Sequence, residues 1–186
     1  MKAFEGSEIS DKAQRFRAEA LPYLDDVYTL ARYLLRNPAD AEDAVQECYL
    51  RAFRHFETLR SGQVKPWLLA ILRNVCRAEY ARRSALASLQ GDSLEAAEQR
   101  TEGLWSAGDG SPEAQALGRL DGETVRRLIA QLPDQFRETI VMREINGLSY
   151  REIADAIAAP VGTVMSRLAR GRALLRAAWI AEESKR

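Results

Sequence analysis

Apolar residues recur every three to four positions over two long stretches of this sequence, and this spacing constrains its fold more than any other feature. The first stretch runs from about residue 11 to residue 84, and the second from about residue 120 to residue 179. Such spacing places apolar side chains along one face of an α-helix. No segment shows sustained period-two alternation flanked by hairpin turns, which is the pattern of a half-buried strand. We therefore predict an all-α protein.

The first stretch predicts three helices. Its first apolar stripe ends at Asn37-Pro38, because a proline disfavours helical backbone in the residue before it. Asp40 follows as a candidate N-cap, with Asp43 three positions later in a box-like arrangement. A third helix begins near Pro66. The three apolar stripes are Leu24, Val27, Tyr28, Ala31, Leu34 and Leu35; Val45, Tyr49, Phe53 and Phe56; and Trp67, Leu68, Ile71, Leu72 and Val75.

Residues 86–118 separate the two stretches and differ from them in composition. They are rich in Gly, Ser and acids, and Arg100 is their only base. This composition predicts an acidic flexible linker, with a short helix around Leu94 to Arg100, and Trp105 would dock on a neighbour or insert into a partner. The expected organisation is an N-terminal tail (1–10), a helical domain (11–85), the linker (86–118), a second helical domain (119–181) and a C-terminal tail (182–186).

The second stretch contains the pattern of two short helices joined by a tight turn. Asn146-Gly147 ends the preceding helix with residues that tolerate a left-handed cap. Ser149 and Glu152 then form a capping box for a short helix, and Ala159-Pro160 marks the turn into the last helix. Two helices joined in this way are the frame of a helix-turn-helix. The residues expected to face inward are Ile153, Ala154, Ile157, Val164, Leu168 and Leu175.

The residues left on the outside of the last helix suit DNA. Hydroxyls and arginines can donate hydrogen bonds to phosphates and to guanine edges, and the segment from Pro160 to Ile180 contains no acid. The alternative is a solvated basic face on an ordinary helical bundle. The outward residues are Thr163, Ser166, Arg167 and Arg170, and the other arginines of the segment are Arg172 and Arg176.

A second basic surface is expected on the third helix of the first stretch. Arg73, Arg77 and Tyr80 fall on one helical face, opposite the core stripe that contains Trp67 and Val75. Basic residues beside an aromatic ring suit single-stranded DNA, with the cations on the backbone and the ring stacked on a base. A plain amphipathic helix would show much the same pattern.

Three segments resemble the sigma-70 family of RNA polymerase sigma factors, and specifically its small extracytoplasmic-function (ECF) type. NPADAEDAVQECYLRAFRHF (37–56) resembles the sigma-2 helix that grips polymerase, and KPWLLAILRNVCRAEYARR (65–83) resembles the promoter-melting and −10-reading segment. Residues 132–175 resemble the sigma-4 domain, most specifically in the phrases GLSYREIA and PVGTVMSRLARGR. The resemblance implies a sigma-2-like bundle and a sigma-4-like helix-turn-helix domain joined by the linker.

The resemblance also implies a function and the residues that carry it. The protein would bind core RNA polymerase, direct promoter-specific initiation and pair with an anti-sigma factor, with no catalytic residue, cofactor or metal. Asn74 matches the residue that lines a pocket for a flipped −10 base, and Arg73, Arg77 and Tyr80 lie near it. The polymerase-binding residues would be Asp40, Glu42, Asp43, Gln46 and Glu47, and the −35-reading residues would be Thr163, Met165, Ser166, Arg167 and Arg170.

Composition excludes several other classes of protein. Basic and acidic residues number 27 each, so their segregation, rather than the net charge, supports nucleic-acid binding. No stretch approaches the roughly twenty apolar residues of a membrane span, and the N-terminus lacks a secretory apolar core, so we expect a cytoplasmic protein. Cys48, Cys76 and His55 form no zinc site of familiar spacing. The cysteines are interpreted as buried apolar residues, with a redox switch as the alternative.

Other functions remain open at this point. A sigma mimic that titrates an anti-sigma factor would lose the reading residues, whereas Asn74, Arg167 and Arg170 are present. A stand-alone helix-turn-helix regulator would not require the acidic helix near Asp40 or the Trp67 segment. An enzyme is the least favoured class, because the sequence contains no Gly-rich phosphate loop or nucleophile motif.

Overall fold

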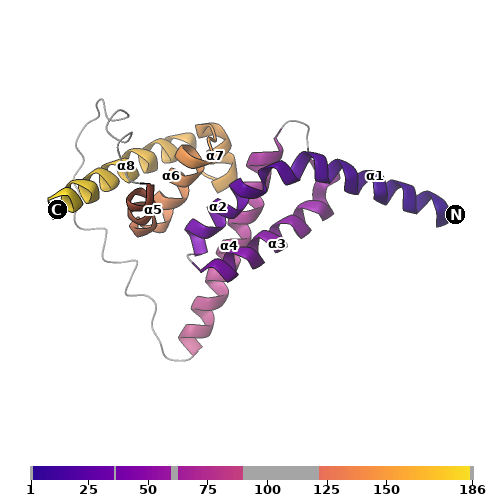
Figure 1. The fold of residues 1–186 in the computed structure, drawn as a ribbon, viewed down its shortest axis with the longest axis horizontal. Coiled ribbons are helices and arrows are strands. Elements are labelled where there is room, and N and C mark those ends of the chain that lie inside the picture. Colours follow the sequence, from indigo (N-terminus) through magenta and orange to yellow (C-terminus); the bar gives the residue numbers. More distant parts are fainter. Residues whose placement is uncertain (1, 36, 60–62, 90–121, 185–186) are drawn as a thin grey trace.

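The computed structural model describes residues 2–35, 37–59, 63–89 and 122–184, and every regular element within these ranges is helical (Figure 1). The predicted all-α class is therefore confirmed. Most of the predicted linker, with Trp105 and the expected short helix from Leu94 to Arg100, lies outside the described residues. Within the described ranges, no helix is long and apolar enough to cross a membrane.

The N-terminal helices form a bundle around α4. In chain order they are α1 (Lys2–Ala20), a 3-10 turn (Leu21–Tyr23), α2 (Leu24–Leu35), α3 (Pro38–His55), a second 3-10 turn (Phe56–Thr58) and α4 (Val64–Leu89). Helix α1 begins within the segment expected to be a tail, and α4 continues four residues into the segment expected to be a linker. Both α2 and α3 pack along α4.

The N-cap of α3 differs from the sequence-based expectation. Asn37, not Asp40, caps this helix: its side-chain Oδ1 accepts a hydrogen bond from the backbone N–H of Ala39 at 3.0 Å. Pro38 occupies the first helical position, where its missing N–H costs no hydrogen bond and its fixed φ suits the helix. Asp40 consequently lies within the first turn, so its assignment as a cap was wrong.

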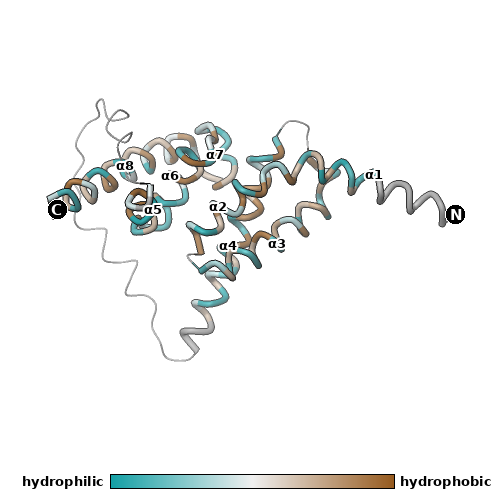
Figure 2. Tube along the Cα trace, viewed as in Figure 1, coloured by the Kyte–Doolittle hydropathy of each residue, from teal (hydrophilic) through white to brown (hydrophobic). Residues whose placement is uncertain are grey.

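Small residues on α3 and large ones on α4 build the core of this bundle. Apolar and polar segments alternate along each helix (Figure 2), as amphipathic packing requires. The ring of Phe16 on α1 meets Tyr49, Phe53 and Phe56 edge-on, with ring centroids 5.2 to 6.0 Å apart. The buried residues at the junction of α3 and α4 include Ala41, Ala44, Val45, Cys48, Ala52, Leu68, Leu69, Leu72, Val75 and Cys76.

The C-terminal helices form a second, smaller bundle. They are α5 (Gly122–Gln131), α6 (Asp134–Ile140), a π-helical turn (Val141–Ile145), α7 (Tyr150–Ile157) and α8 (Val161–Glu183). The expected left-handed break after the π-helical turn is present, because Gly147 has a φ of 72°. Its long last helix, α8, packs on α5, α6 and α7.

The two bundles contact each other directly. Helix α4 packs against α7, and α2 packs against α6 and the π-helical turn. Helix α1 and the C-terminal half of α8 point to opposite ends of the molecule (Figure 1). The contact between bundles therefore lies between α2 and α4 on one side and α6, the π-helical turn and α7 on the other.

Candidate nucleic-acid interface

Helices α7 and α8 form the expected helix-turn-helix. The capping box at the start of α7 is complete: Glu152 N–H donates to the Ser149 hydroxyl at 3.3 Å, and Ser149 N–H donates to the Glu152 carboxylate at 2.7 Å. These hydrogen bonds to Ser149 lower the pKa of Glu152. Ala158 ends α7 in the left-handed conformation, with a φ of 52°, and Pro160 caps the start of α8.

The inward face of this pair is packed as the sequence predicts. Ile153 and Val164 are fully buried, and the small Ala154 is buried as well. Leu168 is also buried, and Leu175 is partly buried farther along α8. This packing fixes which face of α8 remains available to a partner.

The outward face of α8 presents the predicted −35-reading residues. Met165 is 54% exposed, Ser166 and Arg170 are exposed, and Thr163 and Arg167 are partly exposed. The Ser166 hydroxyl donates to the backbone carbonyl of Thr163 at 2.9 Å, so its hydrogen is engaged within the helix. Met165 and Arg170 therefore offer the freest side chains on this face.

Two contacts of arginine side chains that the sequence did not reveal brace the C-terminal bundle, one of them on α8. The Arg172 guanidinium donates to the Glu144 carboxylate at 2.6 Å, which ties α8 to the π-helical turn. Arg143 stacks over the ring of Tyr150 at 5.0 Å and donates to the Leu148 carbonyl at 2.8 Å. Arg172, one of the arginines of the basic segment, thus has a structural partner.

The predicted −10 residues on α4 separate into two groups. Asn74, Arg77 and Tyr80 are exposed, as expected of side chains that meet a DNA strand. Arg73 is only 6% exposed, and its guanidinium pairs with the carboxylate of Glu138 on α6. The expectation that Arg73 shares an exposed face with Arg77 and Tyr80 was therefore wrong. The second bundle covers α4 at Arg73 but not farther along the helix.

The predicted polymerase-binding residues of α3 lie along one edge of the first bundle. Glu42, Asp43 and Gln46 are exposed, whereas Glu47 is partly exposed and pairs with Arg51 at 2.6 Å. Three of the five predicted side chains are thus exposed to solvent, and two of these three, Glu42 and Asp43, carry carboxylates. This acidic surface can contact a basic partner.

Asp40 belongs to a charged cluster that joins α3 to α4. The Arg83 guanidinium donates to the Asp40 carboxylate at 2.7 Å and to Glu79 at 2.8 Å. This hydrogen bond from Arg83 lowers the pKa of Asp40. Hydrogen bonds from Arg82 and Arg83 lower the pKa of Glu79 to about 2. The sequence pattern does not reveal that Asp40 and Glu79 share Arg83 as a partner.

A cavity of about 420 Å³ adjoins this cluster, in the groove between α3 and α4. Both charged and apolar side chains line it. The residues that line it include Asp43, Glu47, Arg51, Val75, Ala78 and Arg82.

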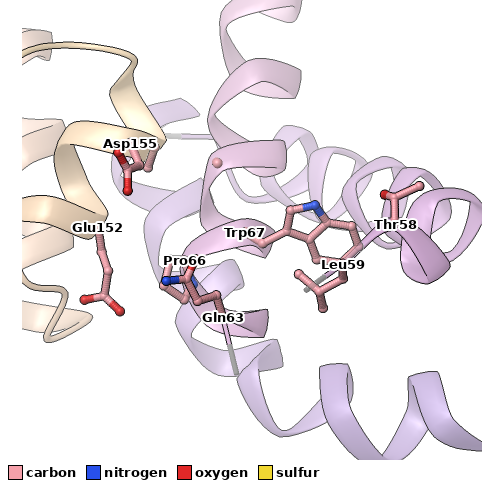
Figure 3. A pocket seen from close by; sticks show the side chains of 9 residues that line it. Thr58, Leu59, Gln63, Pro66, Trp67, Glu152 and Asp155 are labelled. Carbon is pink, nitrogen blue, oxygen red and sulfur yellow. The ribbon is translucent and has the colours of Figure 1, made fainter. Parts of the chain in front are cut away.

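A second cavity, of about 330 Å³, lies where α4 meets α7 (Figure 3). Trp67 and Leu59 form its apolar side, and Glu152 and Asp155 approach from α7. The side chains around it come from both bundles, so the cavity exists only while the two are packed together. The described residues contain no group of three or more side chains suited to holding a metal ion.

Comparisons with known proteins agree with this arrangement. Residues 21–86 match the family model for sigma-70 region 2, and residues 122–175 match that for sigma-70 region 4. The chain is 34% identical to the ECF sigma factor SigE of Mycolicibacterium smegmatis, over 83% of this chain and 57% of SigE. It is 32% identical to the ECF sigma factor SigW of Bacillus subtilis, over 83% of each protein.

Two solved structures share the fold. The sigma factor RpoE in complex with the anti-sigma factor NepR from Bartonella quintana superposes with a TM-score of 0.68 at 25% identity, covering 88% of this chain and 95% of RpoE. CnrH in complex with the cytosolic domain of CnrY gives a TM-score of 0.62 at 21% identity, and the match covers 95% of this chain and 94% of CnrH. The two matched regions and the extensive identity to SigW show that this chain belongs to the ECF RNA polymerase sigma factors, which direct transcription initiation.

Proposed function

We propose that the exposed face of α8 reads the −35 element of a promoter while α4 captures the unpaired −10 strand. The observation that carries this proposal is the division of α8 into a fully packed inward face and an outward face with Met165 and Arg170 in solvent. A helix held in this way can enter the major groove, where an arginine can donate two hydrogen bonds to guanine.

Strand capture is assigned to the exposed part of α4. Asn74 and Arg77 are one helical turn apart with Tyr80 beyond them, and all three are exposed. Extracting a base from the duplex costs a few kcal/mol, which stacking on an aromatic ring and contacts in a pocket offset. Tyr80 can supply the ring, and Asn74 can supply hydrogen bonds to a base edge.

Polymerase binding is assigned to the acidic surface of α3. Glu42, Asp43 and Gln46 are exposed, whereas Asp40 is held by Arg83. We therefore give Asp43 and its exposed neighbours the larger share of this contact. The protein contributes positioning and no catalysis, and it acts in the cytoplasm. An anti-sigma factor restrains it, a role that is supported by the complex of the related sigma factor RpoE with the anti-sigma factor NepR.

Transcription in vitro with core polymerase across a promoter library tests the whole proposal. In the same experiment, if Arg170 reads a −35 base, Arg170→Ala should weaken promoter binding by about 1–3 kcal/mol and relax the preference at that base. A phosphate contact would instead lower affinity evenly and reduce the salt slope by about one. Arg176→Ala, an exposed arginine near the end of the same helix, serves as the matched control.

The two outcomes of this experiment separate the candidate functions. A changed −35 preference in Arg170→Ala, with Arg176→Ala like the wild type, supports α8 as the reader. If Arg170→Ala changes neither the preference nor the salt slope, α8 is not the reader, and titration of an anti-sigma factor by a sigma mimic becomes the better account.

A further inference from the structure

The exposed surface at the start of α8 is mainly apolar. Val161 is 42% exposed and Met165 is 54% exposed. A Cβ at Gly162 would meet no atom within 4 Å, so open space surrounds that position as well. The exposed residues between 161 and 170 are Val161, Gly162, Met165, Ser166, Ala169 and Arg170. Arg170 is the only charged residue among these.

Met165 and Arg170 lie on opposite flanks of this exposed face. The inward side of the helix is marked by its buried residues Val164, Leu168 and Gly171. At 3.6 residues per turn, Met165 and Arg170 are about 140° apart around the helix axis. Between them on the exposed face, the residues before Arg170 are the small Gly162, Ser166 and Ala169. The backbone can therefore approach a groove closely while each of the two long side chains reaches a different base pair.

Met165 cannot donate a hydrogen bond to a base. Its thioether has no N–H or O–H group, and its sulfur is a weak acceptor. The neighbouring Ser166 hydroxyl donates to the carbonyl of Thr163 at 2.9 Å, so its hydrogen is engaged as well. A guanine edge, which presents two acceptors in the major groove, would lose its water here and gain no donor in return. The C5-methyl group of thymine is the apolar feature of the major groove, and it suits an apolar side chain.

We infer that Met165 recognises a T·A pair of the −35 element through the methyl group of thymine. This inference rests on the proposed function, in which α8 reads the −35 element. Removal of one methyl group from water against an apolar side chain raises affinity about fourfold. The unbranched side chain, with its polarizable sulfur, can adapt its shape to that group. Specificity on this flank of α8 thus comes from apolar contact, whereas Arg170 on the other flank supplies hydrogen bonds.

Replacement of thymine by deoxyuridine tests this inference, because it removes the methyl group and keeps the base pair. A promoter is first selected with wild-type holoenzyme from a library that is randomised in the −35 element. Each −35 thymine, on either strand, is then replaced in turn, and the affinity of the holoenzyme for each duplex is measured at one salt concentration. We expect one replacement to weaken binding about fourfold. Met165→Ala holoenzyme should bind the thymine and deoxyuridine duplexes equally.

Three further variants serve as controls. Met165→Leu keeps an apolar side chain at this position, so it should retain most of the preference for thymine over deoxyuridine. Ile180→Ala is the matched control, because Ile180 is 55% exposed near the end of the same helix, and this variant should discriminate like the wild type. Arg170→Ala should also keep the methyl effect, although it relaxes the preference at another base pair.

The outcomes separate this inference from the proposed function. A methyl effect that is lost in Met165→Ala and kept in Ile180→Ala supports the inference. A selected −35 element without thymine, equal binding of every deoxyuridine duplex by the wild type, or a methyl effect that persists in Met165→Ala refutes it. A changed −35 preference in Arg170→Ala would then still support α8 as the reader. If neither Met165→Ala nor Arg170→Ala alters the −35 preference, the proposed function itself fails.

Discussion

Replacing Gly171 by alanine tests how the recognition helix α8 is seated on α6. A Cβ at Gly171 would lie 2.8 Å from Cγ1 and 3.2 Å from Cδ1 of Ile140, and 3.5 Å from Cβ of Phe136. Carbon atoms in favourable contact are about 3.5–4.0 Å apart. Ile140 is 1% exposed and lies in α6, where a β-branched side chain is largely restricted to one χ1 rotamer, so its Cγ1 cannot readily turn away from the added methyl group. Overpacking of this kind costs about 1–3 kcal/mol.

The cost is reduced by the better helix propensity of alanine. Glycine in a helix interior is about 0.8–1 kcal/mol less favourable than alanine, so Gly171→Ala should destabilise the fold by about 1 kcal/mol net. Gly162→Ala is the matched control in the same helix, because a Cβ there meets no atom within 4 Å. In thermal unfolding of the full chain followed by circular dichroism, Gly171→Ala should lower Tm by about 2–4 °C. Gly162→Ala should leave Tm unchanged or raise it, and equal Tm values for the two variants would refute the reasoning.

Four further predictions concern other parts of the molecule. Asp43→Arg combined with Glu47→Arg should abolish co-purification with core polymerase, and retained binding by a variant with native circular dichroism would exclude α3 as the contact. Asn74→Ala should leave Tm nearly unchanged, since Asn74 is exposed, but should impair open-complex formation on duplex promoters. Pre-melted templates should rescue that variant, and failure of rescue would place the role of Asn74 elsewhere. Ala158→Gly should stabilise the fold by about 0.5–1 kcal/mol in urea denaturation, because it relieves a left-handed backbone; a loss of stability would contradict this. Burial raises the pKa of Cys48 and Cys76 to about 12, so a thiol reagent at pH 8 should label them only as the chain unfolds, whereas rapid labelling of the native chain would show that they are accessible.

The helix-turn-helix could be predicted from the sequence because its determinants are local. The capping box joins Ser149 to Glu152 three residues away, and the left-handed break at Gly147 depends on one residue type. Apolar spacing then decides which side of each helix is buried, as at Ile153 and Val164. Each of these features involves residues within one or two helical turns of each other, so a linear pattern contains the information.

The N-cap of α3 was local too, yet the prediction placed it at the wrong residue. Asp and Asn have similar preferences at this position, so Asp40 was a reasonable candidate. The decisive signal was Pro38, because proline is favoured at the first position of a helix and the cap then precedes it. Asn37 followed by Pro38 therefore indicates both the end of α2 and the start of α3. The prediction used only the first of these meanings.

The partners of charged residues could not be predicted, because they lie far away in the sequence. Arg83 meets Asp40 across 43 positions, and Arg73 meets Glu138 across 65 positions. Residue spacing along α4 can show that a side chain lies outside the apolar stripe. It cannot show whether the polar face is covered by another bundle or exposed to water, because both have the same sequence pattern.

The burial of Arg73 therefore carries information that the pattern of α4 cannot. A charged side chain is almost never buried without a partner, so its burial requires an acid at a matching place in another segment. Glu138 meets that requirement, although within its own helix it resembles an ordinary surface acid. A fold that needed only to hold the two bundles together would gain more from an apolar pair, because desolvation offsets most of the attraction between buried charges.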